Sequence, residues 1–474
     1  MNKFYRTLWN AAKGVWQVAG EIGASCGKSK SMRMMRTVLI GPGSLILFST
    51  HALSWELPAH ATVIGGNASI STTGQNMTIH QYSDKVAIDW QGFSIGKDNR
   101  VEFVQPSSTS AALNRVTGDQ VSSIRGALTS NGQVFLINPN GVLFSSAAQV
   151  DVGSLVASTL DIYTEDFMKG NFTFSGSSAN AVINEGDIKT ADGGYIAMIA
   201  AQIINTGSIT ANEGSVLMGA GSRVTLDLGG PVKIEVKEAL LDTYIEQGGA
   251  VRADGGFVYL TAKAASELAS SVINHTGITE AQTLSTGENG EIFLMGDMEY
   301  GRVEVAGTLD ASASETGQGG VVVATAHYVS LEEGVLIDAS GKNGGGAVLV
   351  GGDWQGGANP YWRVFDDPDA VPEATIVNME ESATITASAI ETGDGGTVVL
   401  WSDITKEASV TTVIGHVYAE GGSQSGNGGL VETSGRVLNI NDAQVSTMAP
   451  KGRTGDWLLA RIFHNRQNHY ISRA

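Results

Sequence analysis

The stretch GVLIDASGKNGGGAVLVGG, residues Gly334–Gly352, contains the pattern that determines the fold of this chain. A short apolar strand is followed by an Asp-Ala-Ser turn, a group of glycines and a second apolar strand. Glycine suits corners where φ is positive, or where two stacked backbones approach too closely for a Cβ. Strands this short cannot bury a face alone, so each unit needs a neighbouring copy on which to stack.

The same unit occurs six times after Ile183. The copies are Asp187–Ala200, Ala250–Ala262, Gly307–Ala326, Gly334–Gly352, Ala383–Asp403 and His416–Gly435. This repetition predicts an all-β fold, a right-handed parallel β-helix, with many of the 61 glycines at its corners. At about 20 residues per coil, we expect on the order of twenty coils. A flat two-sheet sandwich is the alternative, but it explains less well why the glycine pairs recur at the same place.

Three segments depart from the repeat. Val63–Val104 is expected to cap the first coil with a short sheet. Ala262–Val272 has a helical composition and is expected to pack outside the coil, and Gly356–Glu373 is expected to form a polar loop. We therefore expect a β-helix with small additional elements outside it.

Residues 1–52 have the features of an export signal. Residues 1–36 carry seven Lys or Arg against one acid, Glu21, and Val38–Phe48 is mostly apolar. Since a membrane-spanning helix needs about 20 apolar residues, this run predicts a signal peptide with an extended basic front. We expect cleavage after Ala52, and Ala59–Ala61 is a second, more distant candidate.

The part that remains after cleavage is acidic. Residues 1–52 carry seven of the 29 basic and one of the 48 acidic residues, so 22 basic and 47 acidic residues remain and the formal charge changes from -19 to -25. A protein with this net negative charge repels nucleic acid, so we exclude a nucleic-acid partner. The single cysteine, Cys26, lies in the signal region. A chain without disulfides suits unfolded passage through a narrow pore.

One turn lies in the stretch LNRVTGDQVSSIRGALTSNGQVFLINPNGVLF, Leu113–Phe144. It places Asn138–Gly141 between the apolar strands Val134–Ile137 and Val142–Phe144. Proline presets φ, while Asn and Gly tolerate positive φ, so the tetrapeptide predicts a tight corner. Taken alone, it indicates a turn and nothing more.

Taken together, the linked motifs resemble the secretion domain of the filamentous haemagglutinin family, exoproteins of Gram-negative two-partner secretion. The family pattern of LNRVTG, a Gly/Ser-rich spacer, NG-x-VFLINPNG and VASTL is matched by Leu113–Gly118, Asn131–Gly141 and Val156–Leu160. Without the Asn-Pro-Asn-Leu tetrapeptide and cysteine pair of the other branch, the sequence resembles the high-molecular-weight adhesin branch. The opening MNKFYRTLWNAAKGVWQVAGE is similar to the extended signal peptides of large exoproteins.

The resemblance implies a secreted or cell-surface, adhesin-like protein and a route for its export. Inner-membrane secretion machinery would move the chain to the periplasm. There, the periplasmic domains of an outer-membrane β-barrel transporter would recognise its N-terminal β-helical domain, and folding outside would favour onward movement. A host-cell receptor or glycan is a further expected partner, and no cofactor is expected. The recognition motif implied by the resemblance comprises Asn114, Arg115, Val116, Thr117, Asn138, Pro139, Asn140 and Gly141.

The loop Gly356–Glu373 is the candidate for a second site. Tyr361, Trp362 and Arg363 have side chains that stack on a sugar or a protein ligand. Three nearby aspartates carry oxygen ligands that a hard cation would accept. Charge clusters in loops are commonly just solvated, so we assign no metal site.

A β-helical polysaccharide enzyme is the alternative from a different class. Its chemistry would need paired carboxylates, or a base beside Arg or Lys, on one exposed face. The histidines outside the signal region show no metal-ligand spacing, and the sequence beyond the signal region has no nucleophile elbow or phosphate loop. Turn-capping explains the acids of the repeats without catalysis. We therefore expect no catalytic residues and no enzyme; those turn acids are Asp192, Asp254, Asp310, Asp338 and Asp394.

Four segments are expected along the chain. They are the extended signal peptide (1–52), the secretion domain with its cap (53–180), further β-helix repeats (181–452) and a tail without regular structure (453–474). After GRTGDWLL at Gly452–Leu459, family members continue with Asp-Pro and a long fibre, whereas this chain ends in the basic ARIFHNRQNHYISRA. We therefore expect a truncated exoprotein, and the N-terminal part of a contact-dependent inhibition exoprotein is the alternative within this class.

Overall fold

The computed structural model describes residues 5–10, 15–20, 56–228, 232–239, 242–264, 271–284, 289–460 and 471–473. The chain divides into two units, Met1–His51 and Ala52–Ala474. In the first unit, β1 (Tyr5–Asn10) pairs antiparallel with β2 (Val15–Gly20). The predicted cleavage after Ala52 lies outside the described residues, as does the central part of the predicted outer helix, residues 265–270.

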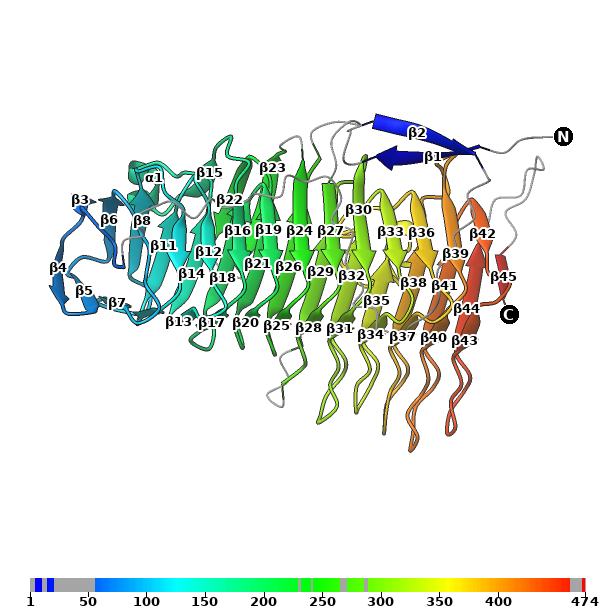
Figure 1. The fold of residues 1–474 in the computed structure, drawn as a ribbon. Helices are drawn as coiled ribbons and strands as arrows, with labels where there is room; N and C mark the ends of the chain where they lie inside the picture. The colour runs from blue at the N-terminus through cyan, green and yellow to red at the C-terminus, as the bar shows by residue number, and fades with distance from the viewer. Residues whose placement is uncertain are drawn as a thin grey trace, which may run out of the picture. The chain divides into compact units, whose positions relative to one another are not determined.

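The second unit is built from three long sheets, whose strands lie side by side from coil to coil (Figure 1). Sheet I contains β3 (Thr62–Gly65), β6 (Lys85–Trp90), β8 (Ala111–Val116), β11 (Gln133–Ile137), β14 (Ser154–Ser158), β18 (Tyr195–Ala200), β21 (Ser215–Ala220), β26 (Phe257–Ala262), β29 (Glu291–Met295), β32 (Val321–Thr325), β35 (Ala347–Val350), β38 (Thr397–Trp401), β41 (Leu430–Ser434), β44 (Asp456–Ala460) and β45 (Ile471–Arg473). Sheet II contains β4 (Ala68–Thr73), β5 (Asn76–Gln81), β7 (Arg100–Val104), β10 (Ala127–Ser130), β13 (Gln149–Val152), β17 (Asp187–Thr190), β20 (Ser208–Thr210), β25 (Ala250–Arg252), β28 (Ile278–Glu280), β31 (Thr308–Asp310), β34 (Leu336–Asp338), β37 (Thr384–Thr386), β40 (His416–Tyr418) and β43 (Gln444–Ser446). Sheet III contains β9 (Ser122–Ile124), β12 (Val142–Phe144), β16 (Ala181–Asn184), β19 (Gln202–Asn205), β24 (Thr243–Gln247), β27 (Ser271–His275), β30 (Gly301–Val305), β33 (Tyr328–Leu331), β36 (Ile376–Met379), β39 (Val410–Val413) and β42 (Val437–Asn439).

Each coil passes from sheet III to sheet II to sheet I, and each strand pairs in parallel with the equivalent strand of the next coil. This is the predicted right-handed parallel β-helix, so the flat sandwich is excluded. The predicted cap is present too, because β3 pairs antiparallel with β6 and β4 pairs antiparallel with β5.

The number of coils is smaller than expected. Within the described residues, sheet I has 15 strands, and all except β3 and β45 are parallel, which gives 13 coils instead of about twenty. The estimate was wrong because most coils are longer than about 20 residues, and long excursions lengthen three of them further. These excursions contain α1 (Thr164–Lys169), β15 (Phe172–Ser175), β22 (Arg223–Asp227), β23 (Lys233–Glu238) and η1 (Trp354–Gly357).

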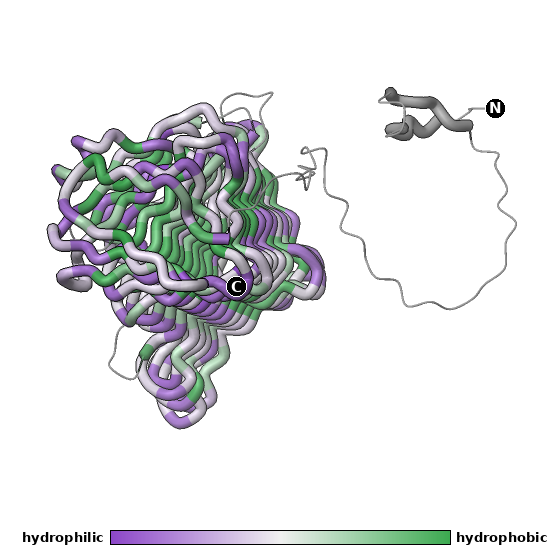
Figure 2. The backbone as a smooth tube through the Cα atoms, turned by 60° about the vertical axis from the view of Figure 1, so that its left-hand side comes forward, coloured by the Kyte–Doolittle hydropathy of each residue, from purple (hydrophilic) through white to green (hydrophobic). Residues whose placement is uncertain are grey.

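The core is a set of apolar ladders inside the coils. In sheet I, equivalent residues of successive strands lie in register and are fully buried, so each new coil covers the apolar surface of the last. One such ladder consists of Val216, Val258, Ile292, Val322, Val348, Val398 and Val431. Figure 2 shows hydrophobic positions, in green, as bands that continue from coil to coil.

Glycines at the corners allow the coils to approach closely. A Cβ on Gly256 would lie 2.1 Å from the carbonyl oxygen of Gly214 in the coil below. A Cβ on Gly320, Gly346 or Gly396 would likewise lie 2.0–2.1 Å from a glycine carbonyl oxygen of the coil below. Only a residue without Cβ fits there, which is the physical reason for the paired glycines of the repeats.

The outer face of sheet I is apolar and is covered by the excursions. Near the N-terminal coils, α1 and the small antiparallel sheet β15-β22-β23 cover Leu113, Phe135 and Leu217. Further along, the segment after β35 covers Leu349 and Val399. The segment after β35 includes the predicted loop Gly356–Glu373, whereas α1 and the sheet β15-β22-β23 were not predicted from the sequence.

The end of the repeat differs from the prediction. β44 (Asp456–Ala460) pairs in parallel with β41, and β45 pairs antiparallel with β44. The expected tail from 453 onward therefore contains one further strand of the stack, because Trp457 and Leu459 continue the alternating pattern of sheet I.

Candidate functional site

The predicted corner Asn138–Gly141 connects β11 to β12 and lies over the preceding coil. Gly141 has φ of 115°, and its N–H donates to the carbonyl of Asn138 at 3.0 Å. Pro139 is exposed, whereas Asn140 is half-buried. The predicted tight turn is therefore present, with proline at its outer surface.

Asn138 is fully buried and holds this corner together. Its side-chain Nδ2 donates to the carbonyl of Gln120 at 2.8 Å and to Ser122 Oγ at 3.0 Å. Its Oδ1 accepts the backbone N–H of Asn140 at 2.9 Å. Because these bonds use both ends of the amide, the Asn138 side chain is not available to a partner of the folded protein.

Asn140 and Pro139 connect the corner to two neighbouring coils. Asn140 Nδ2 donates to the carbonyl of Gly118 at 2.8 Å. The carbonyl of Pro139 accepts Ser178 Oγ at 2.6 Å and Asn180 Nδ2 at 2.8 Å. Ser178 and Asn180 were not predicted, since they lie about forty positions further along and no local pattern marks them.

The second predicted motif, Asn114–Thr117, covers the last three residues of β8 and the residue that follows it. Asn114 is fully buried, accepts Trp90 Nε1 at 3.0 Å, and donates to the carbonyls of Ala112 and Phe135. Val116 is buried in the core. Thr117 is exposed, and its Oγ1 donates to the carbonyl of Trp90 at 3.0 Å.

Arg115 extends from the outer face of sheet I and links three elements. Its Nε lies 2.9 Å from Asp161 Oδ1, one terminal nitrogen lies 3.4 Å from Asp89 Oδ1, and the other donates to the carbonyl of Ile162 at 2.5 Å. Burial raises the pKa of Asp89, and the positive charge of Arg115 opposes that rise. Arg115 therefore attaches the start of the α1 excursion to the coil.

The structure brings the two predicted motifs together at one corner. Gly118 follows Thr117, and its carbonyl accepts the hydrogen bond from Asn140 Nδ2. Glycine is required at this position, because a Cβ would lie 2.1 Å from the carbonyl oxygen of Gln91. Thr117 and Pro139 are the exposed members of the predicted set. We call the surface formed by Thr117, Gly118, Pro139 and Asn140 the recognition corner.

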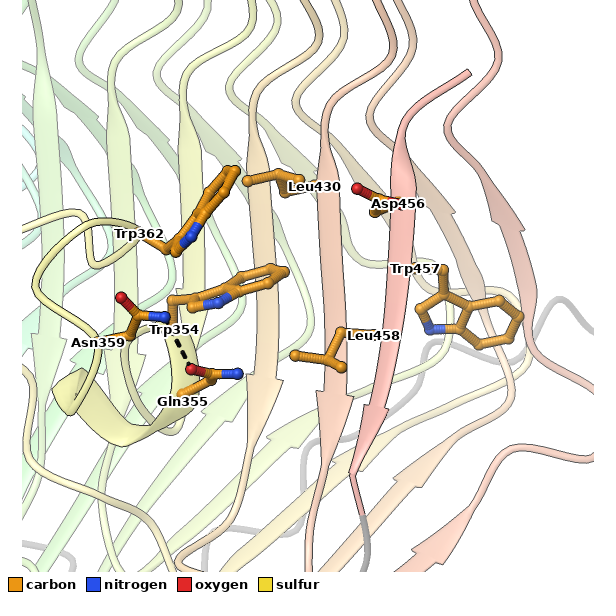
Figure 3. A pocket seen from close by; sticks show the side chains of 8 residues that line it. All are labelled: Trp354, Gln355, Asn359, Trp362, Leu430, Asp456, Trp457 and Leu458. Atoms are coloured by element: carbon orange, nitrogen blue, oxygen red, sulfur yellow. Dashed lines mark hydrogen bonds between the residues drawn. The ribbon is translucent and has the colours of Figure 1, made fainter. Parts of the chain in front are cut away.

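The second candidate site is the loop after η1, shown in Figure 3. Trp354 and Trp362 lie beside a hollow that is also lined by Asn359, Leu430 and Asp456. Of the predicted ligand residues, Trp362 borders it. Tyr361 is 89% exposed and does not border it, and the guanidinium of Arg363 donates to the carbonyl of Asp366.

The described part of the chain holds no cluster of three or more His, Cys, Asp or Glu placed to bind a metal ion. The loop aspartates therefore do not form such a site there. Among the described residues, no helix is long and apolar enough to cross a membrane.

The fold matches a solved structure. The crystal structure of the HMW1 secretion domain from Haemophilus influenzae aligns with a TM-score of 0.71 and 30% sequence identity, over 85% of this chain and 100% of that one. A parallel β-helix with this cap and these corner motifs defines a secreted exoprotein of the two-partner class.

Family comparisons give the same result. The family model described as the TPS secretion domain matches residues 57–311, more than half of the chain, and the Extended Signal Peptide of Type V secretion system matches residues 1–50. The chain belongs to the TPS secretion domain family. The match continues beyond residue 180, where the secretion domain was expected to end.

Two curated relatives are heme/hemopexin-binding proteins of Haemophilus influenzae. One is 33% identical over 264 residues, which is 52% of this chain and 28% of that protein. The other is 30% identical over 286 residues, which is 54% of this chain and 30% of that protein. The chain therefore matches less than one third of each relative's length.

These findings confirm the predicted class and location. The extended signal and the TPS domain direct export through the periplasm and the outer membrane to the secreted or cell-surface state. The TPS domain also identifies a dedicated outer-membrane transporter as a partner.

Proposed function

We propose that this adhesin-like exoprotein is recognised by its transporter before the recognition corner has closed. The observation that carries the proposal is that Asn114 and Asn138 are both 0% exposed in the folded chain. Side chains already hydrogen-bonded inside the coil offer nothing to the periplasmic domains of the transporter. Contacts to these two asparagines therefore belong to the unfolded or partly folded chain.

Folding after export would then make the passage one-way. Each coil buries apolar ladders only when it stacks on the last, so the chain gains its stability outside the membrane. The cysteine-free sequence beyond Cys26 agrees with passage in an extended form. We propose that Thr117 and Pro139 remain accessible at the corner at every stage, because both are exposed after folding.

A binding experiment tests the order of recognition and folding. The exported chain is purified, and its binding to the isolated periplasmic domains of the transporter is measured by interferometry in the folded state and immediately after dilution from urea. We expect tight binding of the freshly diluted chain, and loss of that binding as the far-ultraviolet circular dichroism of the β-helix returns. Equal binding by the fully folded chain would refute this order.

A pair of variants separates recognition from stability. Asn184 is also fully buried; its Nδ2 donates to Asn205 Oδ1 at 2.8 Å, and its Oδ1 accepts the N–H of Gly186 at 3.1 Å. Asn138→Ala and Asn184→Ala should therefore cost similar stability, about 1–3 kcal/mol. If the motif is recognised, only Asn138→Ala accumulates in the periplasm. If both variants are secreted equally, Asn138 is a structural residue only.

We also propose that the chain acts at the cell surface by binding a host receptor or glycan, and not by catalysis. Supporting this, acids of the repeats have structural partners. Asp310 and Asp338 cap their own turns, each accepting a backbone N–H two residues on, at 2.9 and 2.8 Å, and Asp394 accepts the N–H of Asn427 in the next coil at 2.6 Å. These carboxylates stabilise the loops that connect sheet II to sheet I. A screen of the exported chain against polysaccharides for released reducing ends should give no activity above buffer.

A further inference from the structure

The hollow beside η1 has the composition of a small-ligand site. It has a volume of about 160 Å³ and lies between the loop and the outer face of sheet I. Typical pockets for drug-sized ligands measure roughly 300–1,000 Å³, so this one has room for a single ring. Figure 3 shows the rings of Trp354 and Trp362 on one side, Leu430 and Leu458 across from them, and Asp456 at the far rim.

The rings of Trp354 and Trp362 form one side of the hollow, and the ring of Trp362 is partly exposed to solvent. Their ring centroids are 6.4 Å apart and the ring planes are tilted by 35°. Trp354 is buried and supports this side of the hollow, whereas Trp362 is 51% exposed. An indole that stays half exposed beside a hollow offers its face to a ligand.

Two buried carboxylates accept backbone N–H groups of the loop that borders the hollow. Asp353, 2% exposed, accepts the backbone N–H groups of Trp354, Val364 and Phe365 at 2.6–3.1 Å. Glu432, 0% exposed, accepts the N–H of Gln355 at 2.8 Å and Ser434 Oγ at 2.7 Å. Burial raises the pKa of Glu432 to about 7.

Gln355 shows that this arrangement maintains a strained conformation. Its φ of 53° and ψ of 38° lie in the left-handed region, which non-glycine residues rarely adopt. Such residues persist only where the surroundings fix them, and they concentrate at ligand sites. Here the strain directs the side chain of Gln355 to the hollow, where Asn359 Nδ2 donates to its Oε1 at 3.0 Å.

We propose that this hollow binds one pyranose ring of a neutral saccharide. The C–H face of the sugar would stack on Trp362, and its hydroxyl groups would bond to the amides of Gln355 and Asn359 and to the carboxylate of Asp456. An anionic ligand fits poorly, because the carboxylate of Asp456 lies at the rim of the hollow. Arg363 does not compensate, since its guanidinium is held by the carbonyl of Asp366.

The test uses the exported chain and three defined sugars. Methyl α-glucopyranoside, methyl β-galactopyranoside and glucuronate are compared by saturation-transfer NMR and by titration of tryptophan fluorescence at millimolar concentrations. We expect transfer to at least one neutral glycoside and weaker transfer to glucuronate. Trp362→Ala should lower the affinity at least about tenfold, and Asp456→Ala should lower it as well.

Tyr361→Ala is the matched control, because Tyr361 is a neighbouring aromatic that is 89% exposed and does not border the hollow. It should change the affinity by less than about twofold. Absence of transfer to both neutral glycosides, preference for glucuronate, or equal losses in Trp362→Ala and Tyr361→Ala would overturn the proposal. Because binding is measured on protein that has already been exported, its failure would leave the secretion proposal unaffected.

Discussion

Gly249→Ala tests the close packing of the coils, and its neighbour Gly248 supplies the control. A Cβ on Gly249 would lie 2.1 Å from the carbonyl oxygen of Gly207 in the coil below. A Cβ on Gly248 would first meet Thr276 Oγ1 at 3.3 Å, a side-chain atom that has room to shift. The same substitution at adjacent positions therefore differs only in what the new methyl group contacts.

The size of the effect follows from these distances. Ordinary contact begins at 3.4 Å, so Gly249→Ala requires a local separation of about 1.3 Å between coils. That movement strains the bonds from Gly249 N to Asn205 O and from Ala250 N to Gly207 O, each 2.9 Å long. Overpacking costs about 1–3 kcal/mol and each weakened hydrogen bond about 1 kcal/mol, so we expect a loss of roughly 3–5 kcal/mol. Gly248→Ala should cost less than about 0.5 kcal/mol.

Hydrogen exchange is the appropriate assay, because stability in a repeat protein is carried mainly between neighbouring coils. Peptides that cover β20, β25 and β28 should exchange faster in Gly249→Ala, while peptides from β7 and β40 should keep their wild-type rates. In Gly248→Ala all of these peptides should behave as in wild type. Equal exchange in the two variants would refute the close-packing argument.

Two buried ionisable groups give opposite pH dependences. Burial raises the pKa of Glu432 from 4.5 to about 7. Its contribution to folding stability is therefore fully present below about pH 4.5 and is lost as pH rises through 7. Glu432→Gln should raise the free energy of unfolding at pH 8 by about 3 kcal/mol and change it little at pH 4. His275 has its pKa lowered from 6.5 to about 4 by burial, so stability is lost as pH falls from 6.5 towards 4, and His275→Gln should reduce that acid sensitivity. Urea unfolding at pH 4, 6 and 8 checks both, and a pH profile unchanged in either variant would contradict the corresponding assignment.

The repeated glycines were sufficient to predict the β-helix. Their spacing marks where coils meet, and the structure confirms this at Gly256, Gly320, Gly346 and Gly396. The number of coils was not predictable, because the sequence gives no repeat signal that shows where an excursion such as the one containing α1 leaves the coil. Its position is decided by packing on Phe135 and Leu113, contacts that do not appear in the local sequence.

The candidate sites were predicted in part. The turn Asn138–Gly141 was predicted between its two strands and lies there, but the sequence did not indicate that Asn114 lies on β8 or that Asn114 and Asn138 are buried. Burial follows from the neighbouring coil, which supplies Trp90 and Gln120 as hydrogen-bond partners. The loop residues Tyr361, Trp362 and Arg363 were predicted as a group, but of these three only Trp362 borders the hollow. The rest of its lining comes from η1, from Asn359, and from β41 and β44, which lie far along the chain.

Secretion assayed in the presence and absence of the transporter tests the central claim most directly. The chain is expressed in cells that carry its outer-membrane transporter and in matched cells from which the transporter gene has been deleted, and the amounts in the periplasm and the medium are measured by immunoblot. The account predicts that the chain reaches the surface or medium only when the transporter is present, and that it accumulates in the periplasm or is degraded there when the transporter is absent. Equal amounts of the chain in the medium of both cell lines would contradict it.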